Sequence, residues 1–167
     1  MRSIRLTIGL ALGVLPALVL AACGGSTASG TGSSASPTPT PLLHTASIKV
    51  GDKMETVLKN ASELTLYYFK PDTATKIACT GACASNWPPL LATSGAPTSS
   101  PALPGQLTVF NGPNGNQVLY NGHPLYSFSK DTAAADANGQ GVGAKWFVAT
   151  PDLAAMSAAA SESAPAY

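Results

Sequence analysis

Hydrophobic and polar positions divide the chain into segments with different patterns. An apolar run of fifteen residues, 6–20, precedes a polar stretch without charged residues that reaches about residue 47. Beyond it, short apolar stretches alternate with Gly, Asn and Pro, and ten of the eleven aromatic residues fall between Tyr67 and Phe147. No segment of this part holds a helical period over about twelve residues. The pattern predicts one mainly β domain at 48–150, large enough for one modest core.

An internal repeat is the strongest signal within this domain. Segments 66–87 and 125–146 begin with LYYFKPDTA and LYSFSKDTA, which are identical at six of nine positions at an offset of 59. The same offset maps Trp87 onto Trp146, the two tryptophans of the chain. We interpret the domain as two copies of one unit, each containing a strand, a turn, a loop and a tryptophan.

The pattern of each copy favours strands. Aromatic residues two positions apart share one face of a pleated chain, and they suit a half-buried sheet surface. Asn121-Gly122 is a strong signal for a tight turn. Strands are expected at 55–58, 63–69, 107–110, 117–120 and 145–149. The fold class predicted is a small antiparallel β domain built from two sequence repeats.

The N-terminus has the features of an export signal. Two basic residues precede the apolar run, which is shorter than the roughly 20 residues of a membrane-spanning helix. Leu20-Ala21-Ala22-Cys23 resembles the bacterial lipobox, in which the cysteine is acylated and becomes the first mature residue. This resemblance implies a signal peptide at 1–22 and acyl chains such as palmitate on Cys23. They would hold the protein on the extracytoplasmic face of the cell membrane. The alternative is an ordinary secretory signal with a chance cysteine.

The segments on both sides of the domain are expected to be disordered. Residues 23–47 comprise the lipidated cysteine and a Ser/Thr/Pro/Gly tether without charged or aromatic residues, which includes His44. Such a composition buries too little apolar surface to offset its ordering entropy. A spacer is favoured over a glycosylated stalk. Residues 151–167 are rich in Ala and offer little to pack, so they are interpreted as a disordered tail.

Charge excludes one class of function. Charged residues make up 10% of the chain, and nine Lys and Arg stand against eight Asp and Glu. A nearly neutral chain has no field that would gather phosphates, so no nucleic-acid partner is expected.

Several motifs together resemble a known family. They are the two copies of Tyr-x-Phe-x-x-Asp, a Cys-Thr-Gly-Ala-Cys segment before Trp-Pro-Pro-Leu, and Asn-Gly-Gln-Gly-Val-Gly before Trp146. The chain is similar to bacterial secreted-repeat lipoproteins that are defined by a Y-x-[FWY]-x-x-D motif. The resemblance covers about residues 50–150 and the anchor. It implies an exported lipoprotein and assigns no catalytic residue, because the family has no established activity.

The repeated motif has a structural and a binding interpretation. In the favoured one, its aromatic side chains fill two halves of a core and each Asp caps a turn by bonding the backbone two residues on. In the other, hydroxyl, carboxylate and indole groups face a common groove suited to sugars or peptides. The residues concerned are Tyr67, Phe69, Asp72, Trp87, Tyr126, Phe128, Asp131 and Trp146.

Cys79 and Cys83 are the two cysteines that remain if Cys23 is acylated. Outside the cell they are expected to form a disulfide, which would stabilise the fold by about 2 kcal/mol. The second copy has Asn138 and Val142 at these positions. The alternative, a labile redox pair, is less favoured because the spacing is not C-x-x-C.

No cofactor is expected. His123 lies in a turn and is interpreted as a turn residue. As a metal ligand it would need Met54 or a tyrosine beside it to hold copper or haem. The chain has no C-x-x-C-H motif for covalent haem.

Calcium and catalytic motifs are incomplete. The segment from Asp136 begins like a calcium loop, but its twelfth position is Phe147, where a bidentate Glu is required. A looser calcium site would use Asp131 with Asp136. Ser127 and Lys130 form an S-x-x-K string without the partner motifs of a catalytic site. We therefore expect no enzymatic activity.

These observations predict a membrane-anchored, extracytoplasmic lipoprotein that acts as a non-enzymatic binding or envelope-associated module. Its expected partner, besides the membrane, is an envelope polymer or a protein. The first alternative is a metal- or haem-linked electron-transfer lipoprotein. The second is a thiol–disulfide redox protein, which requires the bond between Cys79 and Cys83 to be labile.

Overall fold

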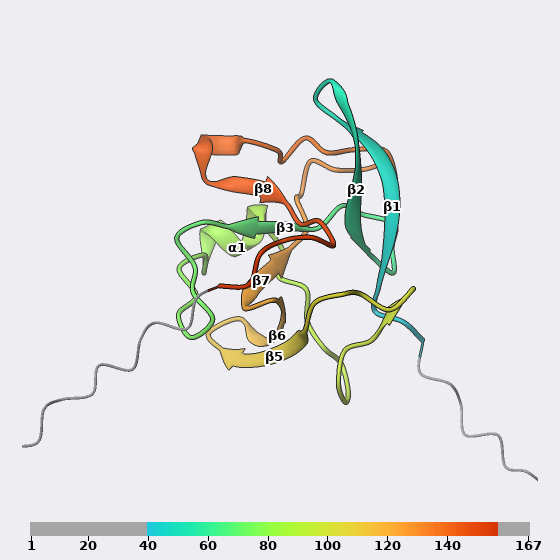
Figure 1. Ribbon diagram of the computed structural model, residues 1–167. Coiled ribbons are helices and arrows are strands. Elements are labelled where there is room, and N and C mark those ends of the chain that lie inside the picture. Colours follow the sequence, from blue (N-terminus) through green and yellow to red (C-terminus); the bar gives the residue numbers. More distant parts are fainter. Residues whose placement is uncertain (1–39, 157–167) are drawn as a thin grey trace, which may run out of the picture. The chain divides into compact units, whose positions relative to one another are not determined.

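The computed structural model describes residues 40–156 (Figure 1). The predicted signal peptide, Cys23 and the predicted tether up to residue 39 lie outside the described residues, as do residues 157–167 of the predicted tail. The elements, in chain order, are β1 (Leu43–Val50), β2 (Lys53–Asn60), β3 (Tyr67–Phe69), α1 (Ala82–Asn86), β4 (Ser99–Ser100), β5 (Leu107–Gly112), β6 (Gly115–Tyr120), β7 (His123–Tyr126), the 3₁₀ turn η1 (Val142–Ala144) and β8 (Trp146–Val148).

The elements confirm the predicted fold class. Two sheets run in the orders β2-β1-β4 and β5-β6-β7-β3-β8, and every pair is antiparallel except β1 with β4. The expected strands at 107–110, 117–120 and 145–149 match β5, β6 and β8. Asn121 and Gly122, with φ of 50° and 84°, make the tight turn from β6 into β7. A two-residue turn of this type requires positive φ at both positions.

The two copies meet at the centre of the larger sheet. Tyr67 of β3 pairs directly with Tyr126 of β7, which is its counterpart in the repeat. On their outer sides, Tyr67 pairs with Val148 and Tyr126 pairs with Pro89. These two pairs are again related by the offset of 59. The tryptophan segment of each copy therefore pairs with the motif strand of the other, about an approximate two-fold axis between the tyrosines.

Backbone hydrogen bonds repeat this exchange. The N–H of Ala149 donates to the carbonyl of Leu66 at 2.8 Å, and the N–H of Leu90 donates to that of Leu125 at 2.9 Å. Two groups of buried side chains lie against this arrangement. One is rich in aromatic rings: Ile48, Val50, Val57, Tyr67, Cys79, Trp87, Tyr126, Phe128, Trp146 and Val148. The other is rich in leucine: Leu43, Leu58, Leu66, Leu90, Val118, Tyr120, Leu125 and Ala149.

The domain begins earlier than the expected boundary at residue 48. Strand β1 starts at Leu43 and pairs along its whole length with β2, so His44 lies in a strand and not in the tether. Leu43 is fully buried and Leu42 packs against the leucine-rich group. The sequence does not indicate that these two leucines are buried, because the residues before them are polar. The leucines reach apolar partners only in the folded domain.

The segment after Pro151 is also ordered further than expected. Leu153 packs against the leucine-rich group. The N–H of Met156 donates to the carbonyl of Asn121 at 2.9 Å, and the side-chain amide of Asn121 donates to the carbonyl of Leu153 at 2.7 Å. The assignment of 151–156 to a disordered tail is therefore wrong, because the turn at Asn121 supplies polar partners for this backbone.

Two local features differ from the sequence prediction. The strands expected at 55–58 and 63–69 meet only at a short bridge, with Lys59 opposite Thr65, whereas the main partner of β2 is β1. The five-residue helix α1 was not predicted, because it is far shorter than the twelve-residue windows that reveal a helical period.

Truncating Leu43 tests the revised start of the domain. We expect Leu43→Ala to lower the free energy of unfolding by about 2–5 kcal/mol, since a fully buried leucine leaves a cavity. Met54 is 68% exposed, so Met54→Ala is the matched control, with a change within about 0.5 kcal/mol. Urea denaturation of both variants measures the effect. Equal stabilities would assign Leu43 to the tether.

Candidate functional site

Tyrosine and aspartate of the repeated motif bond across the two copies. The hydroxyl of Tyr67 donates to Oδ2 of Asp131 at 2.5 Å. The hydroxyl of Tyr126 donates to Oδ2 of Asp72 at 2.6 Å. Because Tyr67 and Asp72 belong to the first copy and Tyr126 and Asp131 to the second, each tyrosine serves the carboxylate of the other copy. The two bonds are reciprocal and follow the two-fold arrangement of the strands.

Each carboxylate also accepts a backbone N–H from its own copy. Oδ1 of Asp72 accepts from Ala78 at 2.7 Å, and Oδ1 of Asp131 accepts from Asn138 at 3.0 Å. The donors lie six and seven residues further along the chain, and not two residues on as the turn-capping prediction had it. The aspartates therefore hold the loops that lead to the tryptophans.

Four aromatic rings form a continuous stack beside these bonds. Trp87 and Trp146 lie in its middle, with ring centroids 3.7 Å apart and planes inclined by 2°. Phe69 stacks on Trp146 at 4.4 Å, and Phe128 stacks on Trp87 at 4.1 Å. Neighbours in the stack always come from different copies. The stack thus gives the exchanged strands a common apolar interior.

Gly139 shows how closely the second loop approaches the rings. A Cβ atom at this position would lie 2.8 Å from the ring of Tyr67 and 2.9 Å from that of Trp87. Its N–H donates to the hydroxyl of Tyr67 at 3.2 Å. The hydroxyl of Tyr67 therefore has both a donor and an acceptor partner, and a glycine is required for this approach.

Burial determines the protonation of the motif. It raises the pKa of Tyr67 and of Tyr126 far above the usual value, and the bonded carboxylates add to this effect. Both hydroxyls therefore remain protonated donors. Burial also raises the pKa of Asp72, although bonds from Tyr126 and the N–H groups of Ala78 and Cys79 oppose the shift.

The motif residues face one another inside the domain. Phe69 is half-buried, and the exposed fraction of each of the other seven side chains is at most 8%. The hydroxyl and carboxylate groups that a groove would present to sugars or peptides are bonded to each other. The arrangement is that of an interior, and it leaves these groups no free direction toward a ligand.

The expected disulfide is confirmed. Cys79 and Cys83 are joined, with Cys79 fully buried and Cys83 partly buried. In the turn at Cys83, the N–H of Cys83 donates to the carbonyl of Thr80. In the equivalent turn of the second copy, the N–H of Val142 donates to the carbonyl of Gly139, and no disulfide is present there. The cross-link therefore supports one of two equivalent loops, next to the N–H groups that bond Asp72.

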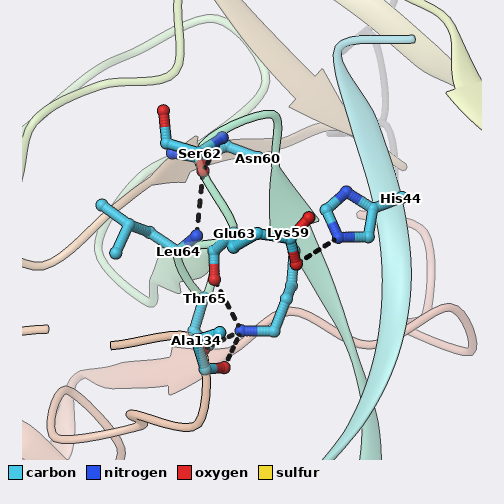
Figure 2. A network of polar contacts seen from close by, with 8 residues as sticks. All are labelled: His44, Lys59, Asn60, Ser62, Glu63, Leu64, Thr65 and Ala134. Carbon is cyan, nitrogen blue, oxygen red and sulfur yellow. Dashed lines mark hydrogen bonds and ion pairs between the residues drawn. The ribbon is translucent and has the colours of Figure 1, made fainter. Parts of the chain in front are cut away.

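Lys59 was missed by the sequence analysis. Its side chain is 1% exposed, and Nζ donates to the carbonyl of Glu63, to Oγ1 of Thr65 and to the carbonyl of Ala134, at 3.0, 3.1 and 2.6 Å (Figure 2). Burial lowers the pKa of Lys59, while the charges of Glu63, Asp131 and Asp136 raise it. Nothing in the alternation of β2 distinguishes this lysine from a solvent-facing one.

The two histidines lie in different environments. Nε2 of His44 is 3.1 Å from Oε2 of Glu63 in a partly exposed pair, which Figure 2 shows beside β1. His123 begins β7, packs edge-on against Tyr68, and has Nε2 3.0 Å from the carbonyl of Ala154. Burial lowers the pKa of His123.

Asp136 serves the local backbone. Its Oδ2 accepts the N–H groups of Thr132 and Ala133 at 2.8 and 2.9 Å, and these bonds lower its pKa. Asp131, its partner in the looser calcium hypothesis, uses its oxygens for Tyr67 and Asn138. Within residues 40–156, no three or more His, Cys, Asp or Glu side chains gather in a way that could hold a metal ion.

The surface has shallow hollows away from the motif's polar groups. One, of about 690 Å³, is lined by Glu55, Thr56, Thr150, Pro151 and Asp152. Another, about 490 Å³, is lined by Ala82, Cys83, Asn86, Trp87, Phe128, Lys130 and Val142. Two rings of the stack, Trp87 and Phe128, line it, and neither motif tyrosine does.

A double-mutant cycle tests the exchanged bonds. Tyr67→Phe and Asp131→Asn are expected to couple by about 1–3 kcal/mol in the free energy of unfolding, because they share one hydrogen bond to a buried carboxylate. Tyr67→Phe and Asp72→Asn, from the same copy, should be nearly additive. Chemical denaturation measures all variants, with Tyr68→Phe as a control for loss of a hydroxyl. Coupling within one copy instead would contradict the exchange.

The raised pKa of Asp72 predicts a pH dependence. The folded protein holds this proton up to a higher pH than the unfolded chain does, so stability falls as pH rises from the unfolded pKa, about 3.9, through the folded one. Asp72→Asn should remove this fall, whereas the exposed Asp52→Asn should not. Unfolding free energies measured from about pH 3.5 upward test it, and parallel curves for Asp72→Asn and the parent would refute it.

The chain was compared with protein families, curated proteins and solved structures. Across residues 40–156 no helix is long and apolar enough to cross a membrane. Searches of curated proteins and of solved structures returned no match. A family model described as a secreted repeat of unknown function matches twice, at residues 50–91 and 108–150, which together make just over half of the chain. These two matches contain the two copies that exchange their tryptophan segments. The chain belongs to this family of secreted repeats.

Proposed function

We propose that the protein is a lipid-anchored, extracytoplasmic binding module without enzymatic activity, whose ligand is an uncharged envelope polymer or protein. The observation that carries the proposal is the interior position of the motif. Its hydroxyl and carboxylate groups are buried and bonded across the two copies, so they stabilise a scaffold and leave recognition to the outer surface.

Membership in a secreted-repeat family supports an extracytoplasmic location. The lipobox-like Leu20-Ala21-Ala22-Cys23 supports the anchor. Two or three acyl chains, at about 0.8 kcal/mol for each buried methylene, suffice to hold a protein on a bilayer.

The distribution of charge supports an uncharged ligand. From Ile77 to Ser129 the chain contains no Asp, Glu, Lys or Arg. This stretch supplies α1, β4, β5, β6 and β7 and the loops between them, whose exposed side chains are mainly Ser, Thr, Asn, Pro and Ala. Such a surface attracts no ion. It offers hydrogen bonds and small apolar contacts instead.

Fatty-acid labelling tests the anchor. Cells that express the full chain are supplied with an alkyne-bearing fatty acid, and the protein is then examined for label and for membrane association. We expect label on the parent, and neither label nor membrane association for Cys23→Ala. Cys79→Ala combined with Cys83→Ala is the control, which should keep both. An unlabelled parent would refute the anchor.

Co-sedimentation tests the uncharged ligand. In one experiment, the lipoprotein in mild detergent is mixed with insoluble cell-wall polymer that has been stripped of protein. In a parallel experiment, the lipoprotein is cross-linked to membrane proteins of the host. We expect retention that changes little between about 0.05 and 0.5 M salt, because screening acts on charges. Thr93→Asp with Asn116→Asp should weaken it, whereas Ser62→Asp with Thr75→Asp should not. The proposal would be refuted if neither the polymer nor any protein were captured, or if salt abolished the capture.

A further inference from the structure

The two edges of the larger sheet differ. At β8, the carbonyl of Trp146 accepts the N–H of Gly141 at 2.8 Å, and the N–H of Val148 donates to Oε1 of Gln140 at 2.8 Å. The loop before β8 thus occupies the outer backbone groups of that strand. At the other edge lies β5, which pairs with β6 alone (Figure 1).

The register shows which groups of β5 point outward. The N–H of Asn121 bonds to the carbonyl of Gln106, and β5 joins β6 through the turn at 113–114. Since bonded residues alternate along an antiparallel ladder, Thr108, Phe110 and Gly112 use their backbone groups toward β6. The N–H and carbonyl groups of the intervening residues point away from the sheet. They belong to Leu107, Val109 and Asn111, and they have no backbone partner among the described residues.

This edge lacks the charges and the proline that commonly protect an edge strand. Natural edge strands carry lysine, proline or inward charges that prevent pairing with another chain. The strand reads LTVFNG, without a charge or a proline, and Val109 is 40% exposed. It also lies inside the uncharged stretch 77–129, so a second copy would bring no like charge against it.

We propose that β5 pairs antiparallel with β5 of a second copy and joins two five-stranded sheets across a two-fold axis. The spacing is self-complementary, because Val109 lies midway between the other two outward residues. Val109 would face Val109 of the second copy, and Leu107 would face Asn111. Each Val109 would then exchange both of its backbone hydrogen bonds with its counterpart. A common membrane would raise the local concentration of both copies.

Cysteine cross-linking of the full-length lipoprotein in its membrane tests this register. In the dimer the Cα atoms of the two central residues lie about 5.5 Å apart, within the range of a disulfide. Under mild oxidation, Val109→Cys should give mainly covalent dimer. Asn111→Cys is the matched control on the same strand. Its two copies would lie about 14 Å apart, so it should stay at background. Equal yields from both variants, or none from Val109→Cys, would overturn the proposal.

Two further measurements test the pairing independently, in case Val109→Cys does not fold. Co-expressed Leu107→Cys and Asn111→Cys chains, distinguished by tags, should form the mixed dimer. Ultracentrifugation of the lipoprotein in detergent should show a dimer for the parent and for Val109→Thr, and a monomer for Val109→Pro. Proline removes only an outward N–H here, so the ladder to β6 is kept. A parent that is monomeric at every concentration, or a Val109→Pro dimer, would refute pairing through β5.

Discussion

The fold depends on how the buried carboxylates of Asp72 and Asp131 are compensated. Within residues 40–156, neither of them forms an ion pair with Lys or Arg. An uncompensated buried charge costs several kcal/mol. Here each carboxylate is compensated by a tyrosine hydroxyl from the other copy and a backbone N–H from its own. In neither copy does the tyrosine bond the aspartate of the same copy. The two repeats are consequently interdependent, and the exchange of their tryptophan segments follows the same rule.

Equivalent positions reach the same geometry by different means. In the first copy a disulfide holds the loop whose N–H groups bond Asp72, and in the second Gly139 brings the corresponding loop onto the rings of Tyr67 and Trp87. Lys59 supports only the second loop, through the carbonyl of Ala134. The bonds between tyrosine and aspartate are therefore equivalent in the two copies, while the groups that support the loops differ. The aromatic stack is likewise shared by both copies, since neighbouring rings come from different copies.

The same arrangement separates the groups that stabilise the domain from those on its outer surface. The motif that marks the repeat is turned inward, where its polar groups form the central hydrogen bonds. The outer surface of β4, β5, β6 and β7 does not contain these hydrogen bonds. The segment from Ile77 to Ser129, which includes these strands, carries no formal charge. One edge of the larger sheet is closed by the loop before β8, whereas the other is left to β5. These features give the surface its proposed roles in binding and in pairing.

The sequence by itself determined the β class, the two copies, the strands from 107 to 120 and the disulfide, because turn residues, periodicity and cysteine spacing are local signals. It could not determine the partners of Tyr67, Asp72, Tyr126 and Asp131, because two identical motifs leave open whether each bonds within its own copy or across. It also concealed Leu43 and Lys59, whose surroundings in sequence are polar or alternating. Only the tertiary structure decided these points, since burial depends on which strands meet, and that is a property of the whole chain.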